Sequence, residues 1–124
     1  MPRNRKWSRD ELILALDLYF KIGTTDASNP LVVELSDSLN ALERFSNHTA
    51  EPDPVKFRNA NGVAMKLSNF ARLDPQYEGK GLGNGGRLEL EIWEEFSRNR
   101  ERLQEHAMGL YQKLGGKQMD YEYI

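Results

Sequence analysis

FRNANGVAMKLSNFARLDP, residues 57–75, carries the clearest helical pattern in the chain. The apolar residues of its second half are Val63, Ala64, Leu67, Phe70 and Ala71. Their spacing predicts an α-helix that buries one face, and Pro75 predicts its end because proline disfavours helical geometry in the residue before it. The opposite face carries Lys66, Asn69 and Arg72, and the predicted helix contains no acidic residue.

The start of this helix has features of a site that receives an anion. Arg58, Asn59 and Asn61 lie at or just before it. The first-turn N–H groups of a helix have no partner within the helix and can bind a phosphate oxygen, while Gly62 would let a backbone approach closely. A nucleic-acid backbone fits this description. The simpler alternative is a helix with ordinary surface cations.

Three further helices are predicted, over residues 9–22, 31–42 and 87–114. Ser8 followed by Glu11 forms a capping-box pattern, and Gly23 marks the end of the first of these helices. Asn29 and Pro30 are typical of a helix start. We therefore expect an all-α fold.

The expected domain is compact and single, with about four to five helices and a Gly-rich loop before the last long helix. It spans residues 1–116, where Gly115 and Gly116 end the last helix. Residues 117–124 are expected to form a tail or the start of a linker.

Composition excludes several kinds of site. The 124 residues include no Cys, which excludes disulfides and thiol nucleophiles, and only two His, His48 and His106, neither with acids at ligand spacing. Glu91, Glu94 and Glu95 lack a partner base or nucleophile and are interpreted as a solvated face. We expect no catalytic residue, metal or cofactor. No secretion signal or membrane-spanning segment is visible, so a cytoplasmic location is expected.

Charge is segregated along the chain although the net charge is only −2. Residues 1–22 and 56–87 carry net charges of +2 and +4, whereas residues 23–55 and 88–124 carry −5 and −3. An acidic protein can present a basic surface when charge is distributed in this way, because local field and not total charge steers a ligand.

Two more basic segments flank the central one. Arg3, Arg5 and Lys6 precede Trp7 and resemble an arm that enters a groove, although solvated termini often carry such residues. Lys80 and Arg87 flank the glycines and could meet phosphates, although a flexible connection is the simpler interpretation.

Three segments resemble the N-terminal region of bacterial HNH endonucleases of the modification-dependent (type IV) restriction kind: RNRKWSRDELILALDLYF, PDPVKFRNANGVAMKLSNFARLDP and GKGLGNGGRLELEIWEEF. The resemblance covers roughly residues 3–97. In those proteins such a module precedes a C-terminal HNH nuclease. In related restriction proteins the N-terminal module reads modified DNA, and the sulfur-binding type recognises phosphorothioate linkages.

The resemblance implies an all-helical DNA reader with a small apolar pocket for the sulfur. A phosphorothioate sulfur is larger and less well hydrated than oxygen, so its pocket should combine apolar atoms with a cation. Asn61, Gly62 and Met65, flanked by Arg58, are the candidates. The chain has no His-Asn-His motif, so cleavage would require residues that it does not contain.

The sequence thus favours a domain that binds double-stranded DNA, modified or not, as the recognition module of an HNH endonuclease. The arm of Arg3, Arg5 and Lys6 would lie on the DNA backbone, and Arg87 would anchor the glycine loop. The residues that would face the DNA groove are Arg58, Asn59, Lys66 and Asn69. The alternative is a helical protein-interaction or dimerisation module, in which the acidic helix over residues 87–114 contacts a partner or a second copy.

Overall fold

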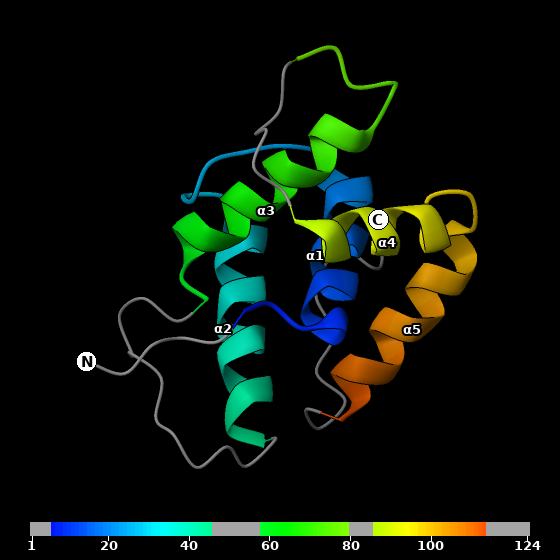
Figure 1. Ribbon diagram of the computed structural model, residues 1–124. Coiled ribbons are helices and arrows are strands. Elements are labelled where there is room, and N and C mark those ends of the chain that lie inside the picture. The colour runs from blue at the N-terminus through cyan, green and yellow to red at the C-terminus, as the bar shows by residue number, and fades with distance from the viewer. Residues whose placement is uncertain (1–5, 46–57, 80–85, 114–124) are drawn as a thin grey trace.

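The computed structural model describes residues 6–45, 58–79 and 86–113, and within these residues all regular structure is helical. The helices are α1 (Arg9–Ile22), α2 (Pro30–Phe45), α3 (Ala60–Leu73), α4 (Arg87–Phe96) and α5 (Arg100–Gln112) (Figure 1). They pack as a single compact unit, so the expected all-α fold is confirmed. The arm residues Arg3 and Arg5, the Gly-rich loop with Lys80, and the C-terminal tail lie outside the described residues.

Helix α1 is the centre of the fold. It contacts each of the other four helices, and Figure 1 shows it surrounded by them. Every residue from Glu11 to Tyr19 is buried, including Glu11 and Asp17. Burial on all sides follows from its position, because neighbours cover the polar face as well.

The predicted helix ends are formed as the local sequence indicates. The Ser8 hydroxyl accepts from the Glu11 N–H while the Glu11 carboxylate accepts from the Ser8 N–H, which completes the capping box of α1. Gly23 ends α1 with a positive φ of 70°. At α3, the Asn59 side chain caps the first turn by accepting the Gly62 N–H at 2.8 Å.

The last predicted helix is not continuous. Residues 87–114 were expected to form one element, but α4 ends at Phe96 and α5 begins at Arg100. Asn99 causes the restart, because its side chain accepts the Arg102 N–H at 3.1 Å and so caps a new helix. On either side of this corner, both helices pack on α1.

Four of the five apolar residues predicted to be buried on α3 are buried, namely Val63, Leu67, Phe70 and Ala71, and Ala64 is half-buried. Helix α5 adds Leu103, Leu110 and Tyr111 to the core. Within the described residues, no helix is both long and apolar enough to cross a membrane.

Two glycines give a paired test of the backbone. Gly23→Ala should destabilise the domain by about 1–3 kcal/mol, because its φ of 70° disfavours residues with a side chain. Gly109→Ala should stabilise it by about 0.5–1 kcal/mol, because Gly109 lies inside α5 and nothing lies within 4 Å of an added methyl group. Chemical denaturation measures both changes, and equal effects of the two substitutions would contradict the assigned geometry.

Candidate nucleic-acid interface

The structure places the predicted site residues in three kinds of environment. Lys6, Asn61, Met65 and Arg87 are exposed, with 56% of Met65 accessible. Asn59, Gly62 and Lys66 are half-buried, and Arg58 and Asn69 are buried. The predicted positions therefore do not form one exposed basic surface.

Arg58 does not face a groove. It is only 5% exposed, and its guanidinium donates to the two carboxylate oxygens of Glu11, with Nε to Oε2 at 2.7 Å and Nη2 to Oε1 at 3.0 Å. A buried guanidinium needs such a partner because leaving water is costly for a charge. The expectation that Arg58 contacts DNA is thus corrected: the residue belongs to the interior.

Arg58 also joins four parts of the chain. Its Nη2 donates to the Lys6 carbonyl oxygen at 3.1 Å, and its guanidinium carbon lies 5.0 Å from the centre of the Trp7 ring. Its carbonyl oxygen accepts from the Ser36 hydroxyl at 2.6 Å, while its backbone has a positive φ of 45°. The segment before α1, α1 itself, α2 and the start of α3 therefore meet at this one side chain and its peptide group.

The start of α3 is already engaged within the protein. The first-turn N–H groups were expected to be able to receive a phosphate oxygen, but one of them, the Gly62 N–H, donates to the Asn59 side chain. A Cβ atom at Gly62 would lie 3.3 Å from the Asn59 Oδ1 atom, so the glycine makes room for this cap. Asn61 and Met65 remain exposed, but Arg58 cannot supply the cation of the predicted sulfur pocket because its guanidinium is paired with Glu11.

Lys66 and Asn69 also differ from their predicted positions. Lys66 Nζ lies 3.5 Å from the Glu89 carboxylate and 5.5 Å from the centre of the Trp7 ring, with its side chain 20% exposed. Asn69 is 5% exposed and lines a groove instead of projecting from the helix. Lys66 thus connects α3 to α4 and to the segment before α1.

A basic groove lies between α3 and the start of α4. It has a volume of about 230 Å³ and is lined by Asn69, Arg72, Leu73, Gly86, Arg87, Glu89 and Leu90. Arg72 and Arg87 are both exposed. Glu89 is the acid in this groove; its carboxylate accepts the Gly86 N–H and lies beside Lys66, so its charge is balanced within the protein.

We call Lys66, Arg72 and Arg87 the basic strip. Arg72 lies on the basic face described in the sequence, but the grouping with Arg87 depends on the packing of α3 against α4, which the sequence does not show. Glu89 was not anticipated, because it is separated from its partner Lys66 by more than twenty residues and by the glycine-rich segment.

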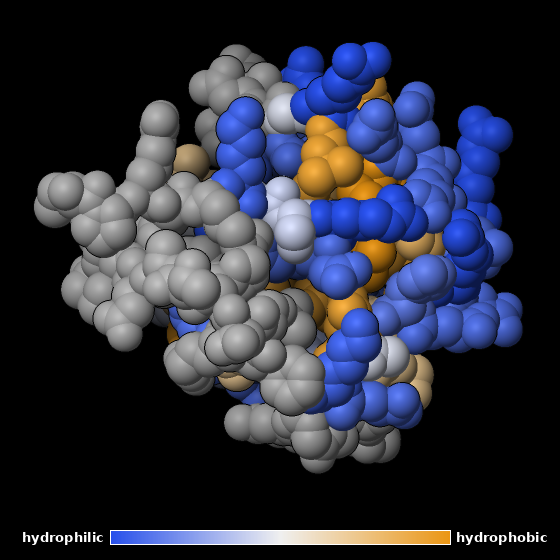
Figure 2. All heavy atoms as spheres, turned by 60° about the horizontal axis from the view of Figure 1, so that its bottom comes forward, coloured by the Kyte–Doolittle hydropathy of each residue, from blue (hydrophilic) through white to orange (hydrophobic). Residues whose placement is uncertain are grey.

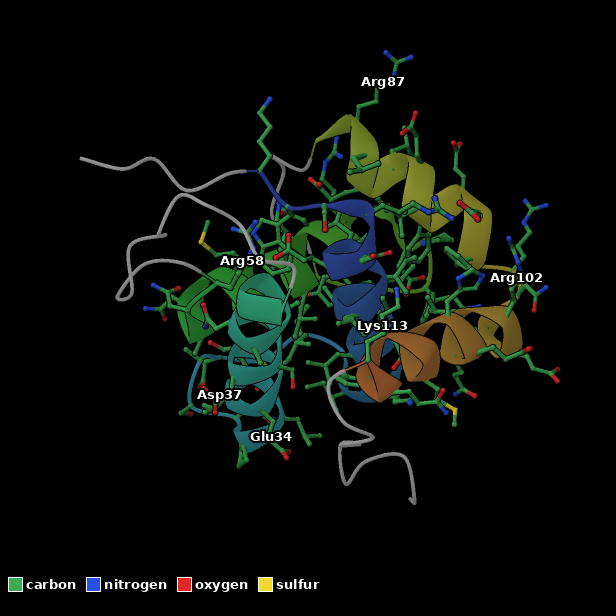
Figure 3. All side chains as sticks on the ribbon, turned by 90° about the horizontal axis from the view of Figure 1, so that it is seen from below. Glu34, Asp37, Arg58, Arg87, Arg102 and Lys113 are labelled. Atoms are coloured by element: carbon green, nitrogen blue, oxygen red, sulfur yellow. The ribbon has the colours of Figure 1, made fainter. Side chains whose placement is uncertain are left out.

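Two acidic side chains of α2 lie on another side of the molecule. Figure 3 shows Glu34 and Asp37 on α2, on the side opposite Arg87. Asp37 is exposed and Glu34 is half-buried. Glu91 and Glu94 of α4 are also exposed, so the exposed acids are not confined to α2.

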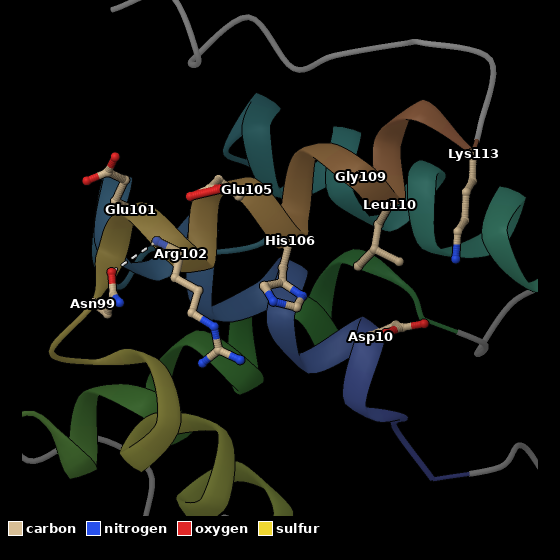
Figure 4. Close-up of a pocket in the computed structure, with 9 residues that line it drawn as sticks. All are labelled: Asp10, Asn99, Glu101, Arg102, Glu105, His106, Gly109, Leu110 and Lys113. Atoms are coloured by element: carbon tan, nitrogen blue, oxygen red, sulfur yellow. Dashed lines mark hydrogen bonds between the residues drawn. The ribbon is translucent and has the colours of Figure 1, made fainter.

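A separate groove of about 760 Å³ follows α5 and the start of α1. Its charged residues are mixed in sign: Asp10, Glu101, Glu105, Arg102 and Lys113, with His106 also in the lining (Figure 4). His106 is exposed and stacks edge-on against Phe96 with ring centres 5.3 Å apart. Among the described residues, no three His, Asp or Glu side chains gather as metal ligands.

The face seen in Figure 2 is mostly hydrophilic where the structure describes it, with apolar side chains showing in a narrow strip between polar ones. Comparison with known proteins adds no assignment: no family model, curated protein or solved structure matches this chain. Function must therefore be argued from the chain's own residues.

The Arg58–Glu11 pair can be tested by its effect on stability. Arg58→Ala should lower the free energy of unfolding by about 3–5 kcal/mol, because it leaves the Glu11 carboxylate buried without its counter-charge. The matched control is Arg102→Ala, which removes an exposed partner of Glu95 and should cost at most about 1 kcal/mol. Urea denaturation measures both changes. Equal losses would show that Arg58 is not a structural residue.

Proposed function

We propose that this domain binds double-stranded DNA, with the basic strip of Lys66, Arg72 and Arg87 against the phosphate backbone. The observation that carries the proposal is the groove between α3 and α4, in which two exposed arginines from different helices lie beside the amide of Asn69. Arginine pairs with phosphate through planar, bidentate hydrogen bonds, and a groove with two arginines suits a backbone better than a single surface cation does.

The charge distribution supports the same orientation. The acidic residues of α2 lie away from Arg87, so the domain would approach DNA with α3 and the N-terminal end of α4 forward, because the rest of α4 carries the exposed Glu91 and Glu94. Lys66 balances the buried Glu89, which leaves Arg72 and Arg87 as the residues of the strip with most access to a ligand. Arg58 contributes by orienting α3 and not by touching DNA.

The resemblance to modification-dependent HNH endonucleases supplies the biological setting of this proposal. In that setting the domain is a recognition module for modified DNA in the bacterial cytoplasm, and cleavage belongs to a nuclease domain elsewhere. Asn61 and Met65, exposed side by side on the first turns of α3, are the described candidates for contact with a modified group. Arg3, Arg5 and Lys80 remain candidates for backbone contact.

Removal of either exposed arginine of the strip should weaken DNA binding. We expect Arg72→Ala and Arg87→Ala each to weaken binding to a 20-base-pair duplex and to reduce the slope of log Kd against log salt by about 1, which corresponds to one lost phosphate contact. Fluorescence anisotropy at several salt concentrations measures both quantities, with unmodified and phosphorothioate duplexes compared in parallel.

Lys113→Ala is the matched control, because it removes the same charge from an exposed site at the end of α5. It should leave the salt slope unchanged. If Arg87→Ala and Lys113→Ala have the same effect, only the net charge matters and the proposed groove is wrong. Binding that is absent in the wild-type protein, together with self-association unaffected by DNA, would favour the alternative, a dimerisation module.

A further inference from the structure

The basic groove continues into a second, larger one. Leu73 and Leu90 line both, so the two hollows meet at these side chains. The second groove has a volume of about 680 Å³ and lies between the end of α1, the residues after α3, and the corner from α4 to α5. Its lining includes Phe20, Gln76, Trp93, Arg98 and Arg100. The function proposed above uses none of these five residues.

The apolar side of this groove is aromatic. The Phe20 and Trp93 rings have centres 5.5 Å apart, and both side chains are half-buried, so part of each ring remains accessible. The Trp93 ring also meets Tyr19 edge-on at 6.3 Å, which holds the indole in a fixed orientation. Leu90 extends the apolar surface toward the basic groove and is 42% exposed.

The polar side is cationic and amide-bearing. The Arg100 guanidinium lies 4.1 Å from the centre of the Phe20 ring, which places a flat cation beside the aromatic pair. Arg98 and Gln76 are exposed on the same lining. Flat apolar rings beside guanidinium and amide groups match a nucleotide, which combines a flat base with a phosphate.

The nearest acid is already engaged. Asp74 accepts a hydrogen bond from the Tyr19 hydroxyl at 2.8 Å and another from the Gln76 N–H at 2.8 Å. Burial and the bond to Asp74 raise the pKa of Tyr19, so its hydroxyl stays protonated and continues to donate. Asp74 therefore repels a phosphate less than an acid without such donors would. The other acid of the lining, Glu94, is exposed to water, which screens its charge.

We infer that this second groove, which we call the aromatic groove, holds one unpaired nucleotide of the bound DNA. The inference rests on the proposed function: the basic strip holds the duplex backbone, and the path past Leu73 and Leu90 leads a displaced nucleotide to Trp93. The base stacks on the accessible face of the Trp93 and Phe20 pair, and Arg98 and Arg100 hold the adjoining phosphate.

Binding of two matched duplexes tests the inference. One is a fully paired 20-base-pair duplex, and the other carries a single unpaired adenosine at its centre. The wild-type protein should bind the second about tenfold more tightly, which is within the range expected when one base stacks on an aromatic side chain. Arg100→Ala should remove most of this preference and change the affinity for the paired duplex little. Lys113→Ala, at the C-cap of the same helix, should keep the preference.

Trp93 provides an independent readout. The chain contains two Trp, so Trp7→Phe leaves Trp93 as the sole source of indole fluorescence. The duplex with the unpaired adenosine should quench this fluorescence at saturation, and the paired duplex should not. Circular dichroism checks that the Trp7→Phe protein keeps its helix content. If it does not, the wild-type protein is used with a duplex that carries 2-aminopurine at the unpaired position. The fluorescence of this base should fall on binding.

The outcomes separate this inference from the proposed function. Equal affinity for the two duplexes and no quenching by either would overturn the aromatic groove, whereas a loss of binding to both duplexes in Arg87→Ala would keep the basic strip. If Arg87→Ala binds both duplexes as tightly as Lys113→Ala does, and neither duplex is preferred, both the basic strip and the aromatic groove are wrong.

Discussion

The buried ion pair between Arg58 and Glu11 is the constraint on which the rest of this structure depends. Two opposite charges are held away from water and joined by two hydrogen bonds, and the Glu11 carboxylate also accepts the Ser8 N–H at the start of α1. Because a lone charge at that depth would be strongly destabilising, the turn before α3 has to approach the start of α1 in a single arrangement. This fixes the rotation of α3, and with it the face that carries Arg72 toward solvent.

The same pair explains which features the sequence could predict. Caps and helix ends depend on residues three or four positions apart, such as Ser8 and Glu11 or Asn59 and Gly62, and these were predicted correctly or follow from local rules. Arg58 was placed on the surface because its partner is 47 positions away, and no local rule pairs them. The corner at Asn99 was missed because the apolar spacing of residues 87–114 continues through it.

The candidate site was predicted in outline and corrected in detail. Charge segregation along the chain indicated a basic surface, and Arg72 and Arg87 do lie on one groove, but Arg58 and Lys66 pair with acids inside the protein and Asn69 is buried. Which cationic side chains form ion pairs with acidic ones depends on how the helices pack, and the sequence does not show this. The aromatic groove could not be predicted for a related reason: Trp93 fits the buried stripe of α4, and its packing against Phe20 depends on residues more than 70 positions apart.

Electrostatic orientation and the two connected grooves form one account of how the domain would meet DNA. Its central claim is that the α3–α4 face, and not α2 or the end of α5, contacts the duplex. The most direct measurement is a titration of the ¹⁵N-labelled protein with a short duplex, followed by NMR. The account predicts that the largest amide shifts fall on residues 66–73 and 86–90, with little change at Glu34, Asp37 or Lys113. Shifts concentrated on α2, or spread evenly over the surface, would contradict it.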